Sequence, residues 1–281
     1  MSPDATCLTT CSDSEPTEFI LPDLLSDCHY PLRLNADCDP VSRASEHWLL
    51  NSARLAEPEV SAFMALLADA SHLRVCCDFM NWLFTMDDWT DEFDVNSTWG
   101  MRQCCISALR DPINFETDKV GGKMCKSLVS GGPGCTERFI YTMDLFFIAV
   151  AKQADDRTNG NIPDLQSYIT MRRDTSACRP YIFSYNMEQS RRDTHNMIAV
   201  VMHEQVSDLQ TAAADVVGWM CKGAIQRFED NRVVLPSWGE ELDRQVAIYV
   251  EGLQNWIVSS LHWPFDSTRY FGKDGLAVKR N

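Results

Sequence analysis

Several patterns that identify common kinds of site are absent from this sequence. Its twelve cysteines contain no Cys-x-x-Cys spacing and its six histidines form no His-x-x-x-His pair, so the usual ligand patterns of a metal motif are missing. The glycine-rich run at 130–134 lacks the Lys-Ser/Thr of a P-loop, and no strand pattern precedes it. We therefore interpret the cysteines mainly as small core residues and the glycine-rich run as a turn.

Basic residues are scarce relative to acids. The chain has 25 Lys and Arg against 40 Asp and Glu, which gives a formal net charge of −15 and a pI near 4.7. Nucleic acids and anionic membrane surfaces are bound through basic patches, so neither is an expected partner. An anionic substrate would have to be held by a few local basic side chains.

Long apolar runs are absent too. No stretch reaches the roughly 18 apolar residues of a membrane-spanning helix, and no basic segment followed by an apolar run opens the chain. We expect a soluble, cytoplasmic protein with no stable membrane insertion. No linker divides the 281 residues, so we expect one domain over 19–281 after a polar, disordered tail at 1–18. The sequence does not specify the oligomeric state.

Apolar residues recur mostly at helical spacing. The spacing predicts helices that begin near Ser42, Glu57, His72, Ser97 and Thr136. Between the first of these helices and the chain start, the prolines at 22, 31 and 40 predict an irregular segment over the body. Thr194 is the predicted N-cap of a long helix, and Ser237 with Glu240 forms a capping box for the last one.

Five acids fall within eight residues, directly after an apolar helical run. On a helix that turns about 100° per residue, Asp87, Asp91 and Asp94 share one face, and Asp88 and Glu92 flank it. Like charges at this spacing cost a helix about 0.2–0.5 kcal/mol per pair, and a helix C-terminus disfavours carboxylates further. The cluster therefore requires a cation, and Mg²⁺ suits carboxylate and phosphate oxygens. A solvated helix end is the alternative.

These acids resemble a known motif. Asp87, Asp88 and Asp91 after an aromatic-rich helix are similar to the Asp-Asp/Glu-x-x-Asp motif of class I terpene synthases, most closely the sesquiterpene synthases of basidiomycete fungi. The resemblance implies an all-α, single-domain helical bundle around a central apolar cavity. It assigns the three aspartates to metal binding, with three Mg²⁺ ions expected in all. Phe84, one turn earlier, would stabilise positive charge in the cavity.

A second stretch, IFSYNMEQSRR at 182–192, resembles the family's second metal motif, Asn-Asp-x-x-Ser-x-x-x-Glu. Ser184 and Glu188 match that motif, and Arg191 stands at a basic position that contacts diphosphate in the family. Pro180 and Tyr181 occupy the Asn and Asp positions, and proline offers no side-chain ligand. One expected Mg²⁺ ligand is therefore missing.

Further residues resemble the family's diphosphate contacts. Arg172 and Arg173 match the helix that carries a diphosphate-sensing arginine, a residue whose planar fork donates paired hydrogen bonds to phosphate oxygens. An ordinary surface pair is the alternative. Arg269 and Tyr270 resemble the C-terminal Arg-Tyr element that contacts diphosphate as the site closes. Trp263 would line the pocket, or else serve as a core aromatic.

The resemblance is interrupted near residues 70, 128 and 180, where the chain looks shortened. Ser184 follows Arg173 by only eleven positions, whereas relatives have considerably more chain between these elements. Abrupt junctions of this kind indicate coding segments skipped in a spliced transcript or gene model. A real shortened protein with altered function is the alternative.

The implied reaction is the Mg²⁺-dependent ionisation of a prenyl diphosphate, farnesyl diphosphate, and its cyclisation to a sesquiterpene with release of diphosphate. One alternative is a catalytically inactive or mis-spliced homologue, because the second metal motif is incomplete. Another is a chain-elongating prenyltransferase, which shares the fold. Such enzymes carry two aspartate-rich motifs, and this sequence has one.

Overall fold

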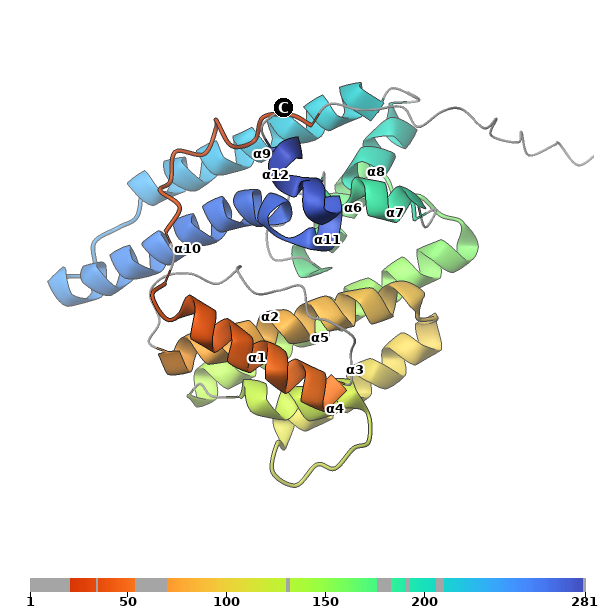
Figure 1. The fold of residues 1–281 in the computed structure, drawn as a ribbon, viewed down its shortest axis with the longest axis vertical. Coiled ribbons are helices and arrows are strands. Elements are labelled where there is room, and N and C mark those ends of the chain that lie inside the picture. The colour runs from red at the N-terminus through yellow and green to blue at the C-terminus, as the bar shows by residue number, and fades with distance from the viewer. Residues whose placement is uncertain are drawn as a thin grey trace, which may run out of the picture.

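In the computed structural model, all regular secondary structure in the residues that the structure describes is helical (Figure 1). The structure describes residues 21–33, 35–53, 70–129, 132–175, 183–190, 193–205 and 210–279. No strand occurs in these ranges, so the all-α prediction is confirmed. The tail predicted at 1–18 and the helix predicted from Glu57 lie outside them. The helices are α1 (Cys38–Ala53), α2 (Ala70–Glu92), α3 (Val95–Arg110), α4 (Val120–Cys125), α5 (Pro133–Asn159), α6 (Leu165–Thr175), α7 (Tyr185–Ser190), α8 (Met197–Glu204), α9 (Gln210–Val233), α10 (Glu240–Asp266), α11 (Thr268–Phe271) and α12 (Gly275–Val278), with short 3-10 turns at Lys126–Leu128 and Gly272–Asp274.

The first five helices enclose one apolar core, in the lower part of Figure 1. α1 packs against α2, and α3 packs against α4 and α5. Trp82 and Met86 of α2 and Phe147 of α5 are completely buried there. The indole N–H of Trp82 donates to the carbonyl oxygen of Gly121 at 3.2 Å, so its one polar atom is satisfied. Because each such side chain stabilises the fold by about 1.5–3 kcal/mol, α2 is firmly held up to the turn that carries the acids.

A second core joins α6, α8, α9 and the C-terminal part of α10. Tyr168 of α6 and Ile198 and Val200 of α8 are fully buried in it. Tyr270 of α11 contacts both cores, which places the end of the chain beside α2. Residues separated by most of the sequence therefore meet at this junction.

Residues 21–33 form an irregular segment along α9 and α10, as predicted for the proline-rich stretch. The hydroxyl of Tyr30 donates to Glu229 of α9 at 2.6 Å, and Arg33 pairs with Glu251 of α10. The two side chains fasten the segment to both helices.

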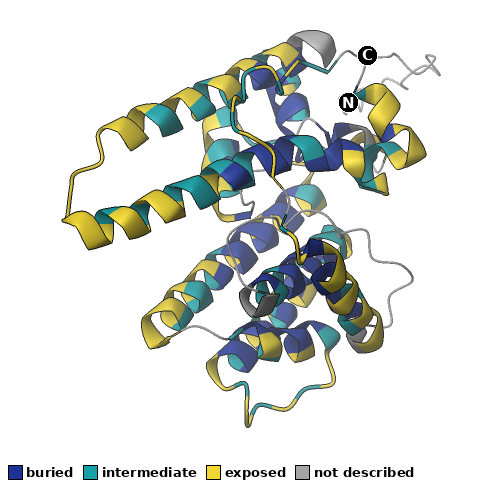
Figure 2. Cartoon of the chain, turned by 60° about the vertical axis from the view of Figure 1, so that its left-hand side comes forward, coloured by how far each residue is buried: buried dark blue, intermediate teal, exposed yellow. Residues whose placement is uncertain are grey.

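The hairpin of α9 and α10 extends beyond the rest of the molecule, and exposed residues dominate its turn (Figure 2). Val233, Val234 and Trp238 are each more than half exposed there. Across the described residues, no helix has the length and apolar character needed to span a membrane.

The predicted capping box at Ser237 is wrong. α10 begins at Glu240 after the N-cap Gly239, and the Ser237 hydroxyl instead donates to Oδ2 of Asp243 at 2.5 Å. Asp243 also accepts the backbone N–H of Trp238 at 2.7 Å. A carboxylate three residues further along the helix thus takes the capping role expected of Glu240.

The long helix predicted from Thr194 also differs. α8 begins at Met197, and its N-cap is Asn196, whose Oδ1 accepts the N–H of Ile198 at 2.8 Å. α8 ends at Glu204, and α9 is a separate helix. Thr and Asn both cap helices well, so the sequence pattern alone does not choose between them.

Candidate active site

The helix that carries the acids is longer than predicted. α2 continues past Thr85 to Glu92, so the acidic motif lies in its last two turns. The helix therefore carries the three predicted metal ligands, Asp87, Asp88 and Asp91. Asp94 does not share their face, because it lies beyond the helix and caps α3, where its carboxylate accepts the N–H of Ser97 at 2.7 Å.

Arg269 of α11 binds the acidic motif directly. Its two terminal nitrogens donate to the two carboxylate oxygens of Asp88 at 2.6 and 3.2 Å, and Asp87 lies 3.7 Å away. The Arg269 side chain is only 11% exposed. Burial lowers the pKa of Arg269, but the hydrogen bond and charge of Asp88 outweigh burial and raise it. The guanidinium is thus the cation that the crowded carboxylates require in this structure.

Aromatic rings form the wall behind this ion pair. The Arg269 guanidinium lies 4.9 Å from the ring centre of Phe84 and 5.9 Å from that of Tyr270. Trp263 packs between them, with ring centres 5.0 Å from Phe84 and 5.6 Å from Tyr270. The structure therefore brings six of the predicted site residues together, from α2, the end of α10 and α11. Trp263 is also a member of the first core, as its alternative role as a core aromatic predicts.

Asp91 lies among other acids on the side of α2 that faces α5 and α7. Burial raises the pKa of Asp91 to about 7, and the charges of Asp87 and Asp193 contribute further. Arg157 of α5 opposes this rise, and its guanidinium donates to the backbone carbonyl of Thr90 at 2.7 Å. Arg157 therefore both satisfies a carbonyl at the end of α2 and adds positive charge beside the motif.

The second predicted motif is only partly described. Ser184 and Glu188 lie one turn apart at α7, and the N–H of Glu188 donates to the carbonyl oxygen of Ser184 at 3.0 Å. Burial raises the pKa of Glu188 to about 7, while the charge of Arg172 and the hydrogen bonds of Asn196 and Ser184 oppose the rise. The negative charge of Glu188 also contributes to the raised pKa of Asp91.

The predicted diphosphate-binding arginines separate into three cases. Arg172 acts on Glu188 and stacks on Tyr168, with the guanidinium carbon 5.6 Å from the ring centre. Arg173, its neighbour on α6, is exposed. Arg191 lies outside the described residues, as do Pro180 and Tyr181. The geometry thus favours Arg172 over Arg173.

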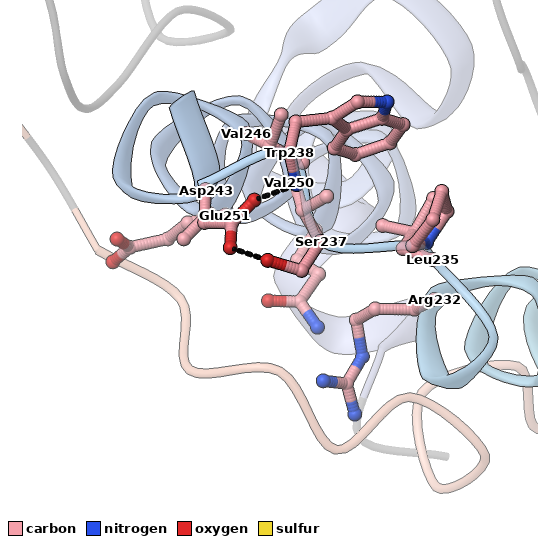
Figure 3. Close-up of a pocket in the computed structure, with 11 residues that line it drawn as sticks. Arg232, Leu235, Ser237, Trp238, Asp243, Val246, Val250 and Glu251 are labelled. Carbon is pink, nitrogen blue, oxygen red and sulfur yellow. Dashed lines mark hydrogen bonds between the residues drawn. The ribbon is translucent and has the colours of Figure 1, made fainter. Parts of the chain in front are cut away.

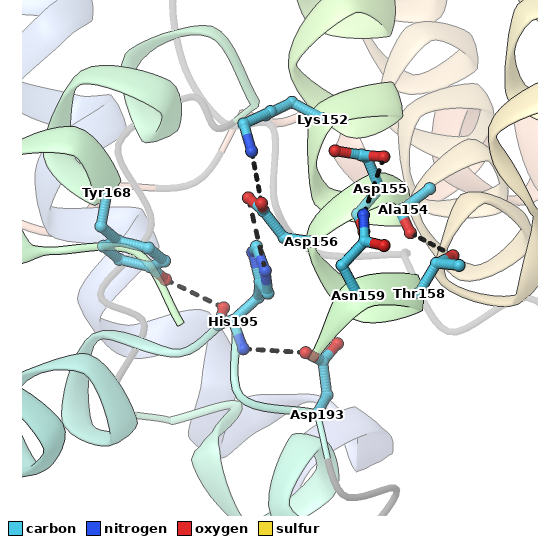
Figure 4. A network of polar contacts seen from close by, with 9 residues as sticks. All are labelled: Lys152, Ala154, Asp155, Asp156, Thr158, Asn159, Tyr168, Asp193 and His195. Atoms are coloured by element: carbon cyan, nitrogen blue, oxygen red, sulfur yellow. Dashed lines mark hydrogen bonds and ion pairs between the residues drawn. The ribbon is translucent and has the colours of Figure 1, made fainter. Parts of the chain in front are cut away.

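A polar network around Asp156 and His195, both buried, was not predicted from the sequence (Figure 4). Asp156 of α5 pairs with Lys152, and the Nε2 atom of His195 lies 3.9 Å from its carboxylate. The N–H of His195 donates to Asp193 at 2.8 Å, and the hydroxyl of Tyr168 donates to the carbonyl oxygen of His195 at 3.0 Å. A sequence signal did exist, because a run of Asp, Thr, His and Asn before an apolar helix is typical of an N-terminal cap.

The oxygen donors of the two motifs match the chemistry of Mg²⁺, which prefers carboxylates and retains water and phosphate ligands. Among the described residues, however, no three His, Cys, Asp or Glu side chains already surround a single point at metal distance. In this structure the Asp88 carboxylate is instead paired with Arg269. The raised pKa values of Asp91 and Glu188 show that burial and neighbouring acids disfavour uncompensated charge there, so added positive charge suits both.

A separate surface pocket of about 370 Å³ lies at the turn between α9 and α10 (Figure 3). Leu235, Trp238 and Val250 give it apolar walls, and Arg232 and Glu251 lie at its edge. None of its lining residues belongs to either acidic motif. It is therefore not the site where these motifs would act.

Comparison with known proteins identifies the family. A family model described as "Terpene synthase family 2, C-terminal metal binding" matches residues 78–182 and 181–227. The match divides at the third junction inferred from the sequence. Sesquiterpene synthase 1 of Postia placenta is 42% identical, with 96% of this chain and 95% of the relative covered. Alpha-muurolene synthase of Coprinopsis cinerea is 37% identical, with 100% and 80% covered.

Over the region that aligns, the relative from Postia placenta has more residues than this chain. The alignment extends over 323 residues, more than the 281 of this chain, so the relative carries segments without a counterpart here.

Solved structures show the same fold. Linalool/nerolidol synthase from Streptomyces clavuligerus, in complex with 2-fluorogeranyl diphosphate, superimposes with a TM-score of 0.70 at 14% identity, covering 84% of this chain and 97% of that one. Germacradien-4-ol synthase from Streptomyces citricolor gives a TM-score of 0.68 at 16% identity, with 84% and 98% covered. Because the family model matches more than half of the chain and the relative from Postia placenta is 42% identical over 96% of it, the chain belongs to the terpene synthase family.

Proposed function

We propose that this protein ionises farnesyl diphosphate and cyclises the resulting cation to a sesquiterpene, with release of diphosphate. The observation that carries the proposal is the meeting of Asp88, Arg269 and the aromatic wall at one point, although α2 and α11 are far apart in sequence. The identity to sesquiterpene synthases indicates the chain length of the substrate.

In the proposed reaction, basic side chains bind the leaving diphosphate and aromatic side chains surround the carbocation. The C–O bond to diphosphate breaks and its electron pair leaves with the diphosphate. In this proposal Arg172, Arg269 and Tyr270 hold the leaving group, and Arg173 and Arg191 complete the set predicted from sequence. The faces of Phe84 and Trp263 stabilise the carbocation and exclude water while a double bond of the substrate closes the ring. Loss of a proton then gives a hydrocarbon.

The metal-binding part of the proposal assigns Asp87, Asp88 and Asp91 to one side of the site, and Ser184 and Glu188 to the other. Three Mg²⁺ ions, the number expected from the family, would supply positive charge that neutralises the leaving diphosphate. In this chain the carboxylates must first release Arg269. A diphosphate can promote that exchange, because the guanidinium binds phosphate oxygens as readily as carboxylate oxygens.

The test is direct. Purified protein is incubated with farnesyl diphosphate and Mg²⁺, and the headspace is analysed by gas chromatography with mass spectrometry. Geranyl and geranylgeranyl diphosphate serve as shorter and longer substrates, and Asp87→Asn as the matched variant. We expect a cyclic hydrocarbon of fifteen carbons that requires Mg²⁺ and disappears in Asp87→Asn. Retained activity in that variant contradicts the metal assignment.

A second function is favoured by a specific observation. The family match divides at 181–182, and Pro180 stands where the second motif has its Asn, so a folded but non-catalytic homologue is the competing proposal. Absence of product from protein whose circular dichroism shows a helical fold supports this alternative and overturns the first.

A further inference from the structure

The short loop between α7 and α8 holds a buried asparagine with two fixed hydrogen bonds. Asn196 is completely buried. Its Nδ2 donates to Oε2 of Glu188 at 2.6 Å, and its Oδ1 accepts the backbone N–H of Ile198 at 2.8 Å. One side chain thus connects the first turn of α8 with a carboxylate of the second motif.

The second of these bonds determines the direction of the first. Because the carbonyl oxygen of the amide is held by the N–H of Ile198, the amide nitrogen must point to the opposite side, where Glu188 lies. The cap of α8 therefore sets the position of the donor. Rotation of the amide by half a turn would break both bonds at once.

Residues 193–196, directly before α8, are held from two sides. The N–H of Asp193 donates to the carbonyl oxygen of Glu188 at 2.9 Å. The hydroxyl of Tyr168 on α6 holds the carbonyl oxygen of His195. Asn196 therefore directly follows residues that are hydrogen-bonded to both α6 and α7.

We propose that Asn196 is a positioning residue for the second metal motif, which orients the Glu188 carboxylate toward a divalent cation by a hydrogen bond anchored in the cap of α8. The inference rests on the proposed function. It assigns Asn196 no contact with the metal or substrate. Its importance is greater in this chain than in a complete motif, because Pro180 supplies no ligand and leaves Ser184 and Glu188 to hold the cation.

The test uses a substitution that separates the two bonds. Asn196→Ser keeps an oxygen that caps α8 well but removes the donor to Glu188. Asp164→Ser is the matched control, since Asp164 accepts the N–H of Ser167 at 2.9 Å at the start of α6 and does not contact Glu188. The readout is thermal unfolding in the presence of inorganic diphosphate at increasing Mg²⁺, which gives the Mg²⁺ concentration of half-maximal stabilisation without any need for turnover.

We expect Asn196→Ser to raise that Mg²⁺ concentration about 10- to 100-fold, the usual effect of losing a group that orients a metal ligand. Asp164→Ser should leave it unchanged. Adding Asn196→Ser to a Glu188→Gln protein should have no further effect, because the asparagine acts through Glu188. An unchanged Mg²⁺ requirement in Asn196→Ser, or a full additional loss in the double variant, overturns the inference.

The outcomes also separate this inference from the proposed function. If Glu188→Gln raises the Mg²⁺ requirement and Asn196→Ser does not, the second metal motif stands and the role of Asn196 is wrong. If neither variant changes it, both are wrong. Should Asn196→Ser fail to fold, the isosteric Asn196→Asp keeps the volume and the cap, and a Mg²⁺ requirement equal to wild type in that variant also overturns the inference.

Discussion

At the scale of single residues, Arg269 provides positive charge beside the mutually repelling carboxylates of the acidic motif. Carboxylates at the C-terminal end of a helix face both each other and the negative end of the helix dipole, so they need a nearby cation. In the structure the guanidinium of Arg269 supplies it through two hydrogen bonds to Asp88. The same residue was predicted to bind diphosphate, and both tasks use its planar fork.

The paired hydrogen-bonding geometry of the Arg269 guanidinium can be tested separately from its positive charge. Arg269→Lys keeps the positive charge but loses the paired geometry, so we expect the rate of diphosphate release to fall about 10- to 100-fold. Arg232→Lys is the control, because Arg232 lies on the distant α9 and pairs with Glu229. Diphosphate release is measured by a coupled assay with farnesyl diphosphate. A wild-type rate in Arg269→Lys would show that charge alone is enough.

The two acids with raised pKa values, Asp91 and Glu188, predict how stability depends on pH. Burial raises the pKa of Asp91 and of Glu188 to about 7, so each carboxyl keeps its proton in the folded protein after the unfolded chain has lost it. The unfolded state therefore binds fewer protons between about pH 4 and pH 7, and stability decreases as the pH rises through this range.

Thermal unfolding without metal checks this expectation. The midpoint should be lower at about pH 8 than at about pH 5, by roughly 2–4 °C for each kcal/mol lost. Asp91→Asn removes one of the two groups and should make the decrease smaller, and added Mg²⁺ with diphosphate should offset it. A midpoint that rises with pH over this range contradicts the protonation of both acids.

Local residue patterns were predicted well, and distant pairings were not. The aspartates and Phe84 are neighbours on one helix, so spacing alone placed them together. Asn196 was missed, because its partner Glu188 is eight residues away across a loop whose shape the sequence does not reveal. Resemblance suggested Arg269 and Tyr270, but nothing in the sequence showed that Arg269 would bind Asp88 rather than remain open for diphosphate.

At the scale of elements, α2 must be rigid for the acidic motif to keep its place. Trp82 is completely buried, and its ring packs against Phe146 and Phe147 of α5, with centres 6.2 Å away in each case. We expect Trp82→Ala to lower the free energy of unfolding by about 3–5 kcal/mol. Trp219→Ala, at a tryptophan that is 80% exposed, should change it by less than about 0.5 kcal/mol.

Urea unfolding followed by circular dichroism measures both values. Similar losses for the two tryptophans would mean that the core around α2 is not packed as described. Loss of activity in Trp82→Ala at temperatures where it remains folded would further show that the motif depends on this packing.

Helix periodicity predicted the existence of elements better than their ends. The apolar residues of α2, α3 and α5 recur along one face of each helix, and in the structure this face is packed against neighbouring helices. The position where a helix begins depends on which nearby polar group accepts hydrogen bonds from the N–H groups at its start. Just before α10 the carboxylate of Asp243, not that of Glu240, accepts the backbone N–H of Trp238, and at α8 Asn196 caps instead of Thr194. A capping pattern lists candidates, and the tertiary contacts select one.

At the scale of the whole molecule, the chain keeps the family's fold while it lacks part of the family's length. The solved terpene synthases superimpose on most of the described fold, yet the relative from Postia placenta has segments with no counterpart here. The sites of shortening near 70, 128 and 180 remain predictions, and the division of the family match at 181–182 supports the third. A loss at the third site would remove the Asn expected as a metal ligand and also chain that would cover apolar surface.

The third junction can be restored and its effect measured. We expect insertion of the corresponding segment of sesquiterpene synthase 1 between Pro180 and Tyr181 to raise cyclase activity at least about tenfold and to lower the Mg²⁺ requirement, because it returns the missing Asn ligand to the second motif. A Gly/Ser insertion of equal length is the control and should give neither effect. A second control combines the insertion with Glu188→Gln, which should cancel the gain if the restored site works through Glu188. No change in activity or in Mg²⁺ requirement after insertion would mean that Ser184, Glu188 and the aspartates already suffice, and that the shortened chain is a complete enzyme in its own right.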